Sequence, residues 1–538
     1  MKYGEIRLRN FRCFDWDQPA TIEFRDGFTA LIGPNNSGKS TALRAIFELR
    51  PLFELLPVII TEPLDRSRHV GLSSETDPAA FANSRDSSRF HVTLCSEIAS
   101  SKRRIPYAKE VTFEFNTNNQ MISVITVIAF DDKGIRFQLD PSSMSNLIPS
   151  GEQNIVAHKA DNPKYIDFSS IVEFAASLYS SRYFPAARNA INEGAGKHYD
   201  CHIGTSFIGS WDSWKAGASR ERKIAIRKVE SEIGSLLGIN RLEVNADQTN
   251  KTFDVFIDDH PHKLHEVGSG LAQLILTLSS ALIERPDFIC IDEPELCLHP
   301  GLQTRFMLTL GSYAKRGVIF ATHSMGLARS VAQHIYSVHR AGPGKSTILP
   351  FGHQHPNLAE WLGELGYSAL TNVGYDGLLL VEGQTEVLCF QEFLRKIGKD
   401  HKYVVLSLGG SSLIQKGAKI ELAELTRLVP ANRIRGYIDS ERVAAEDELD
   451  TAHKEFLSTC GELGISMRVS DRRAIENYFT SSAIKSALGD ESYAALEPFE
   501  RLKDAQKYWS KSKNWLIVRE MSMDDLKNTD LYEFLLAL

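Results

Sequence analysis

The feature that most constrains this chain is a glycine-rich segment near its start, Gly33-Pro34-Asn35-Asn36-Ser37-Gly38-Lys39-Ser40, which fits the pattern GxxxxGK[ST]. It follows a strand-like run, FTALI, and precedes a helical pattern with an apolar face. Glycines permit the tight turn in which backbone N–H groups and a helix N-terminus point at phosphates. We therefore expect an ATP site in which Lys39 neutralises β/γ-phosphate charge and the Ser40 hydroxyl reaches Mg²⁺. The expected binding residues of this loop are Gly33, Asn35, Asn36, Ser37, Gly38, Lys39, Ser40 and Thr41.

A second segment, Gly342-Pro343-Gly344-Lys345-Ser346-Thr347, has the tail of the same pattern. His339 stands where the first glycine of the pattern is required, so the loop cannot turn in the same way. We expect a turn between two short strands here and no phosphate site.

An apolar strand, Phe288-Ile289-Cys290-Ile291, ends in the acid pair Asp292-Glu293. A buried strand that ends in acids is common and is weak evidence alone. Together with the glycine-rich loop it predicts that Asp292 holds the Mg²⁺ shell while Glu293 polarises the attacking water.

Three further segments place the loop in a class of ATPases. Gly268-Ser269-Gly270-Leu271-Ala272-Gln273 resembles the signature motif of ABC ATPases, Pro294 to Pro300 resembles their D-loop, and Ala321-Thr322-His323-Ser324 resembles the strand that ends in the switch histidine. Their order is similar to that of the ABC ATPases of the structural-maintenance and recombination type. The resemblance implies that His323 acts in hydrolysis. It also implies that Ser269 and Gly270 close over a nucleotide held by a second head, so that the protein is at least a homodimer.

Acidic residues recur at strand ends in the C-terminal third. Glu382 ends the run LLLV and Glu386 lies one helical turn further, while Asp439 and Glu441 follow the strand-like run IRGYI. Such acids also occur as solvated groups at strand ends and helix N-termini, where carboxylates are favoured. Converging carboxylates suit Mg²⁺ or Mn²⁺, and two such ions can clamp a scissile phosphate.

The run LLLVEGQTE followed by an Asp-x-acid strand resembles a Toprim domain, and the order of the two parts resembles the OLD (overcoming lysogenisation defect) family, which includes Gabija-type and retron-associated anti-phage effectors. The resemblance implies a metal-dependent endonuclease that cuts DNA under nucleotide control. It implies metal ligands at Glu382, Glu386, Asp439, Glu441 and Glu476, with Glu382 also catalytic, and a catalytic lysine at Lys511 or Lys513. Glu441 departs from the family pattern, which has Asp at this place.

At 538 residues, the chain is long enough for more than one domain. Its formal net charge of −7 gives no overall indication of a polyanion partner. We expect an α/β chain: an ABC-type P-loop ATPase head at 1–365, with a mainly helical insertion at about 55–260 and a dimerisation element at about 190–240, then a Rossmann-like Toprim domain at 375–538. Seven scattered cysteines and an N-terminus without an apolar signal run predict a cytoplasmic protein without a membrane partner.

Several alternatives remain open on the sequence. The substrate could be RNA or tRNA, or the chain could be an ATPase sensor or scaffold with a degenerate Toprim domain that acts through a defence-system partner or a retron component. Two basic stretches, Lys102-Arg103-Arg104 and Arg220 to Lys228, could meet phosphates, although a solvated face is the default interpretation.

Overall fold

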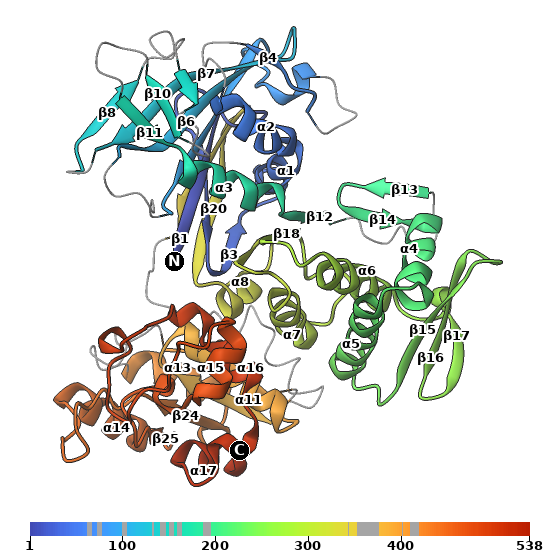
Figure 1. Cartoon of the computed structure of the whole chain (residues 1–538). Helices are drawn as coiled ribbons and strands as arrows, with labels where there is room; N and C mark the ends of the chain where they lie inside the picture. The colour runs from blue at the N-terminus through green and yellow to red at the C-terminus, as the bar shows by residue number, and fades with distance from the viewer. Residues whose placement is uncertain are drawn as a thin grey trace. The chain divides into compact units, whose positions relative to one another are not determined.

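The chain is described by a computed structural model, which covers all residues except 62–66, 73–77, 99–104, 132–133, 140–146, 150–154, 159–163, 187–194, 343, 352–375, 401 and 409–418 (Figure 1). It divides into two compact units. The first holds Met1–Cys297, Thr309–His323 and His334–Phe351, and the second holds Leu298–Leu308, Ser324–Gln333 and Gly352–Leu538. The domain boundary expected between residues 365 and 375 lies outside the described residues.

A six-stranded sheet forms the centre of the first unit, in the order β12-β18-β19-β3-β20-β21. Its strands run parallel except β21, which turns back along β20. Strands β18 and β19 are buried over their whole length, as is typical of parallel strands covered on both faces. The bounds are β3 Gly27–Ile32, β12 Arg182–Phe184, β18 Phe288–Asp292, β19 Gly317–Thr322, β20 His334–Gly342 and β21 Lys345–Pro350.

A second, ten-stranded sheet follows the order β2-β1-β5-β6-β11-β10-β9, with β4, β7 and β8 off this path. Buried and partly exposed residues alternate along β5 and β6, so one face of these strands packs on the core. The bounds are β1 Lys2–Arg9, β2 Ala20–Arg25, β4 Arg68–His69, β5 Arg89–Ser96, β6 Tyr107–Asn116, β7 Met121–Phe130, β8 Arg136–Leu139, β9 Leu147–Pro149, β10 Ile155–His158 and β11 Lys164–Asp167.

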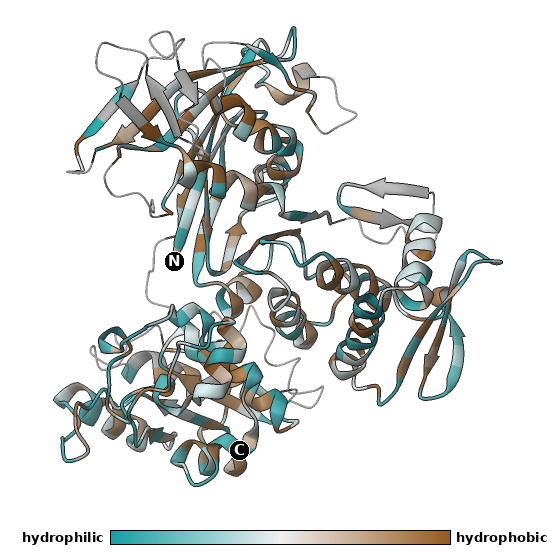
Figure 2. Cartoon of the chain, in the orientation of Figure 1, coloured by the Kyte–Doolittle hydropathy of each residue, from teal (hydrophilic) through white to brown (hydrophobic). Residues whose placement is uncertain are grey.

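Three helices, α1 (Lys39–Glu48), α2 (Arg50–Thr61) and α3 (Ser169–Tyr179), contribute to the hydrophobic core that joins the two sheets (Figure 1). Phe24 of β2 lies in this core and contacts Phe174 of α3 and Phe288 of β18, with ring centroids 5.6 and 5.1 Å apart. Figure 2 shows hydrophobic residues along these strands and helices, interspersed with hydrophilic ones. The loop that follows β3 therefore lies between two elements, β3 and α1, that both contribute to this core.

The rest of the first unit combines a small antiparallel sheet, β15-β16-β17, with long helices (Figure 1). Its aromatic core includes Phe207, Trp211 and Phe253, and the Trp211 indole N–H donates to the Val244 carbonyl at 3.0 Å. The bounds are β13 Ala195–His198, β14 Cys201–Ile203, α4 Gly204–Ala216, α5 Arg220–Leu237, β15 Leu242–Asp247, β16 Thr252–Ile257, β17 His260–Lys263 and α6 Ser269–Glu284.

The prediction that the insertion at about 55–260 is mainly helical is wrong. Most of its described elements are strands, from β4 to β17, with α3, α4 and α5 among them. The period-2 alternation of runs such as RFHVTLCS and YAKEVTFEFN favours half-buried strands, and this local signal outweighed the helical stretches that surround it.

The second unit is built on a four-stranded, wholly parallel sheet in the order β23-β22-β24-β25. The strand bounds are β22 Gly377–Val381, β23 Tyr403–Ser407, β24 Ile434–Ile438 and β25 Ser466–Val469. The helices are α7 Pro300–Gly311, whose last residues belong to the first unit, α8 Met325–Val331, α11 Gln384–Lys396, α13 Lys419–Leu428, α14 Thr451–Glu462, α15 Ser481–Leu488, α16 Asn514–Glu520 and α17 Asp530–Ala537. Within the described ranges, no helix is long and apolar enough to cross a membrane.

Candidate functional site

The glycine-rich loop leaves the carboxyl end of β3 and leads directly into α1. Gly38 caps this helix with φ 111°, and a Cβ built there would lie 2.8 Å from Cys13 Sγ. Gly33 has φ 153°, and a Cβ on it would lie 2.3 Å from the Val338 carbonyl oxygen. Both positions therefore require glycine, and the loop presents the N-terminus of α1 at the sheet edge as a phosphate site demands.

Lys39, the first residue of α1, lies inside this loop. Its ammonium donates to the carbonyl oxygens of Gly33 at 2.9 Å and Pro34 at 3.0 Å, and lies 3.2 Å from His323 Nε2. Burial lowers the pKa of Lys39 and outweighs the opposing effect of Asp292, Glu293 and Glu295. A cation held in this way on loop carbonyls can exchange them for phosphate oxygens.

The other loop positions differ in exposure. Ser37 is buried, whereas Asn35, Asn36 and the magnesium candidate Ser40 are exposed at the carboxyl edge of the sheet. Thr41 is half-buried, and its hydroxyl hydrogen-bonds to the Cys13 thiol behind the loop.

The predicted acid pair and histidine come to the same edge because β3, β19 and β18 are neighbouring parallel strands. Asp292, the last residue of β18, pairs in register with Ala321, and Thr322 pairs with Ile32 just before the loop. Asp292 is 4% exposed. Glu293 Oε1 lies 3.4 Å from His323 Nε2, so Lys39, His323 and Glu293 form one connected group. Glu293 has φ 45°, a conformation that non-glycine residues adopt mainly at constrained sites.

Glu295 also belongs to this site, although no role was predicted for it from the sequence. Its Oε1 accepts from the Thr322 hydroxyl at 2.6 Å and from the His323 backbone N–H at 3.0 Å. It therefore fixes the position of the histidine. The sequence signals were its place two residues after the acid pair and within the segment that resembles the D-loop.

The signature residues Ser269 and Gly270 open helix α6, for which Gly268 is the N-cap. Gly268 and Ser269 are exposed, and Gly270 is partly exposed. Gln273, one turn further, is buried and donates to the Pro294 carbonyl at 3.4 Å. No hydrogen bond or ion pair joins Ser269 or Gly270 to the phosphate loop among the residues that the structure describes.

In the second unit, the C-terminal acids gather at the carboxyl edge of the parallel sheet. Glu382 directly follows β22 and Asp439 directly follows its neighbour β24, while Glu386 lies in the first turn of α11. Glu476 lies in the short 3₁₀ turn Ile475–Tyr478. Glu386, Asp439 and Glu476 are 7%, 4% and 2% exposed, so this carboxylate cluster is almost wholly desolvated.

The acids of the carboxylate cluster raise each other's pKa. Burial, Glu386 and Glu441 raise the pKa of Glu382 to about 7. Burial and Glu476 raise the pKa of Glu386, and burial with Glu386 and Glu476 raises that of Asp439. Mutual repulsion of buried carboxylates is relieved by protons, by cations, or by both.

Protein donors hold three of the four acids. Lys511 Nζ lies 2.8 Å from Glu476 Oε1, to which the Asn514 amide also donates at 3.1 Å. The Ile475 N–H donates to Asp439 at 3.1 Å and the Thr385 hydroxyl to Glu386 at 3.0 Å. Burial by itself lowers the pKa of the Lys511 ammonium. The charges of Glu476, Glu386 and Asp439 outweigh burial, so the pKa of Lys511 is raised. Asn514 was not foreseen, because a single Asn between Lys513 and an apolar run carries no signal by itself.

Of the two lysines predicted here, Lys511 makes the contact with the cluster, and Lys513 is a half-buried residue at the end of the same 3₁₀ turn. Glu441 is turned aside. It is exposed with φ 53°, pairs with the Arg473 guanidinium, and donates its N–H to the Arg473 carbonyl at 3.0 Å. As the side chains stand, no three His, Cys, Asp or Glu groups of the described chain are placed to hold a metal ion.

Family models match the N-terminal part of the chain. The family model described as "AAA domain, putative AbiEii toxin, Type IV TA system" matches residues 28–329, and one described as "AAA domain" matches residues 5–47. No curated protein matches the chain.

Solved structures with similarity include two SMC heads and a RecF protein. An Smc head bound to the C-winged helix domain of ScpA has 14% identity and a TM-score of 0.39, covering 65% of this chain and 99% of its own. The SMC head domain from Thermotoga maritima has 15% identity and a TM-score of 0.31, covering 65% and 100%. The recombination mediator protein RecF, bound to ATPγS, has 10% identity and a TM-score of 0.33, covering 65% and 98%.

The first of the two family models spans more than half of the 538 residues and includes the phosphate loop, the acid pair and His323. The chain is thus a P-loop ATPase that belongs to the family described as AAA domain, putative AbiEii toxin, Type IV TA system.

Proposed function

We propose that this ATPase is an OLD-type, metal-dependent endonuclease that cuts DNA under the control of ATP, in anti-phage defence. The observation that carries the proposal is the carboxylate cluster: Glu382, Glu386, Asp439 and Glu476 at the carboxyl edge of a parallel sheet, with Lys511 beside them. Buried acids at this density destabilise a fold unless a cation joins them. A toxin in the description of the family fits a nucleic-acid-damaging effector.

The donor set of the cluster suits Mg²⁺ or Mn²⁺. All four acids supply hard oxygen ligands, and Glu382 Oε2 is buried without a hydrogen-bond partner among the described residues. Glu382, Glu386, Asp439 and Glu476 would hold the ion, which supplies polarisation of the scissile phosphate and activation of water. Lys511 is positioned to neutralise charge on the phosphate, and Asn514 keeps the Glu476 carboxylate in place.

Nucleotide control follows from the first unit. Lys39, Glu293 and His323 would bind and hydrolyse ATP, with Mg²⁺ held by Ser40 and Asp292. Ser269 is exposed and Gly270 is partly exposed, so both can approach a nucleotide on a second copy of the chain, which supports a homodimer of heads.

The test is cleavage by the purified full-length chain of supercoiled plasmid and of total tRNA, with Mg²⁺ or Mn²⁺, with and without ATP. We expect cutting that Glu382→Ala abolishes while ATP hydrolysis continues. Cleavage of tRNA alone would change the substrate from DNA to RNA. Cutting that persists in Glu382→Ala would place the nuclease centre elsewhere.

A second candidate function is an ATPase sensor or scaffold with a degenerate second unit, acting through a defence-system partner or a retron component. The observation that favours it is Glu441, which is engaged by Arg473 rather than turned into the carboxylate cluster. Absence of Mn²⁺ binding by the full-length chain, with intact ATP hydrolysis, would support this candidate against the nuclease.

A further inference from the structure

A groove of about 790 Å³ lies in the first unit between the start of α5 and the end of α6. Its floor is apolar, with Ala225, Leu282 and Ile283, and its rim carries Arg222, Lys228 and Arg285. The described residues that line it include one acid, Glu221. The groove is thus a basic channel, although the chain as a whole is acidic.

The first turns of α5 concentrate positive charge. The stretch RERKIAIRK, residues 220–228, holds five basic residues against one acid. All five are exposed, and none forms a salt bridge with another residue that the structure describes; they are Arg220, Arg222, Lys223, Arg227 and Lys228. Five cations against one acid in nine residues is a local excess of positive charge, although Lys228 has an acid, Glu232, four positions further along the helix.

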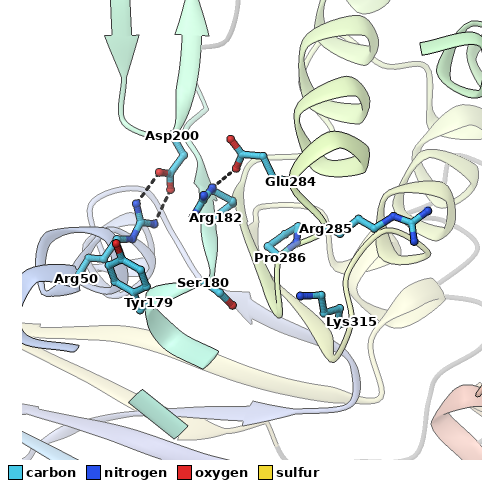
Figure 3. A pocket seen from close by; sticks show the side chains of 9 residues that line it. All are labelled: Arg50, Tyr179, Ser180, Arg182, Asp200, Glu284, Arg285, Pro286 and Lys315. Atoms are coloured by element: carbon cyan, nitrogen blue, oxygen red, sulfur yellow. Dashed lines mark hydrogen bonds and ion pairs between the residues drawn. The ribbon is translucent and has the colours of Figure 1, made fainter. Parts of the chain in front are cut away.

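The basic surface continues past the groove. A second cavity, of about 310 Å³, shares Arg285 with it and adds Lys315, whose side chain is 60% exposed and whose Nζ lies 3.5 Å from Asp287 Oδ1 (Figure 3). The two carboxylates in this cavity are already paired, Asp200 with Arg50 at 2.6 Å and Glu284 with Arg182. In Figure 3 the Arg285 side chain extends away from both pairs. The Arg285 side chain can therefore contact a ligand in the groove. The two paired carboxylates repel an incoming anion less than unpaired carboxylates would.

We propose that this groove binds the sugar-phosphate backbone of a nucleic acid. The two cations that α5 contributes to the groove, Arg222 and Lys228, lie about 9 Å apart along the helix, which matches two to three phosphates of one strand. The described groove residues carry no aromatic ring on which bases could stack, so binding is expected to be independent of sequence. A second copy of the chain is a poor occupant, because a symmetric contact would set this basic face against itself.

The inference deepens the proposed function, since it rests on nucleic acid being the substrate or activator, and it places the binding surface in the ATPase unit rather than at the acidic cluster. DNA and RNA share the recognised phosphodiester chemistry. Both are therefore used as probes in the test.

The experiment measures binding of labelled single-stranded DNA, duplex DNA and tRNA to the full-length chain in EDTA, across a series of NaCl concentrations. The test variant is Arg222→Gln/Lys228→Gln/Arg285→Gln. The control, Arg85→Gln/Arg136→Gln/Arg340→Gln, removes the same charge from exposed positions elsewhere in the first unit. We expect the test variant to bind at least about tenfold more weakly and to lose about two to three from the slope of log Kd against log salt concentration. The control should change Kd less than about twofold.

Unchanged affinity in the test variant while the unaltered chain binds nucleic acid would overturn the groove and leave the nuclease proposal standing. Equal loss in both variants would also overturn it, because the effect would then be one of net charge. Loss of self-association in the test variant without loss of binding would assign the face to a dimer contact instead. Failure of the unaltered chain both to bind and to cut any probe would remove the groove and the nuclease together. Unchanged ATP hydrolysis in both variants shows that they are folded.

Discussion

The two candidate sites use the same architectural position with opposite charge. In the first unit the carboxyl edge of a parallel sheet presents Lys39 and a helix N-terminus, which receive an anion. In the second unit the equivalent edge presents buried carboxylates, which under the proposed function would receive a cation. The comparison teaches that a parallel α/β layer fixes where chemistry happens, while the residues just after the strands decide what it acts on.

The largest expected effect separates the true phosphate loop from its look-alike. Lys39→Ala should weaken ATP binding by about 3 kcal/mol, roughly a hundredfold, because a charge-assisted contact is lost. Lys345→Ala is the matched control, since Lys345 pairs with Asp15 and Asp17, both at 3.3 Å, outside the loop. Titration with a fluorescent ATP analogue measures both. Equal ATP affinity in the unaltered chain and in Lys39→Ala would show that the loop around Lys39 is not the anion site.

The second effect tests which acids belong to the proposed metal site. Glu382→Gln should lower metal-dependent cleavage by about a hundredfold, whereas Glu441→Gln should lower it less than tenfold because Glu441 is engaged by Arg473. Single-turnover cleavage rates at saturating Mn²⁺ decide between them. A larger loss in Glu441→Gln would mean that this side chain joins the cluster when metal binds.

The third effect concerns pH in the absence of divalent metal. Because the pKa of Glu382 is about 7 in the folded chain against an ordinary value of 4.5, the folded state retains a proton that the unfolded state releases. The free energy of unfolding should therefore fall as pH rises from 5 to 8, by up to about 3 kcal/mol.

Chemical denaturation in EDTA at each pH measures this fall, and Glu382→Gln should flatten it. Added Mn²⁺ should restore stability at pH 8, since the ion binds the folded state alone. A free energy of unfolding that rises with pH in this range would show that burial and repulsion among the carboxylates do not raise the pKa of Glu382.

The smallest effect separates the two lysines. Lys511→Ala leaves the buried Glu476 carboxylate with the Asn514 amide but without its ammonium partner, and should destabilise the metal-free chain by about 1 kcal/mol at pH 7. Lys513→Ala is the control and should change stability by less than about 0.5 kcal/mol. Urea denaturation compares them. An equal loss in both variants would end the distinction between Lys511 and Lys513.

The sequence predicted most where the signal is local. The loop Gly33 to Ser40 and the strand Phe288–Asp292 are contiguous patterns, and their chemistry is set by backbone geometry within a few residues. Glu382 and Asp439 could be foreseen as strand-end acids for the same reason, because the carboxyl ends of neighbouring parallel strands meet at one edge.

The rest depends on distant contacts that no short pattern encodes. The turn of Glu441 toward Arg473, the support of Glu476 by Asn514, and the anchoring of His323 by Glu295 all join residues that are far apart in the chain. The insertion is a different case, because its period-2 runs, such as RFHVTLCS, favour strands locally and the helical interpretation gave them too little weight.

The division of the chain into its units has a practical consequence. Five residues after Glu293 the chain enters a segment of the second unit, directly after His323 it does so again, and it passes between the units five times in all. Arg305 of α7 pairs with Asp400 of the second unit, and α8 packs against α11. The segments of the two units therefore alternate along one polypeptide, and no single truncation yields the second unit whole: a fragment that begins at residue 375 lacks α7 and α8, so one side of α11 loses its packing partner.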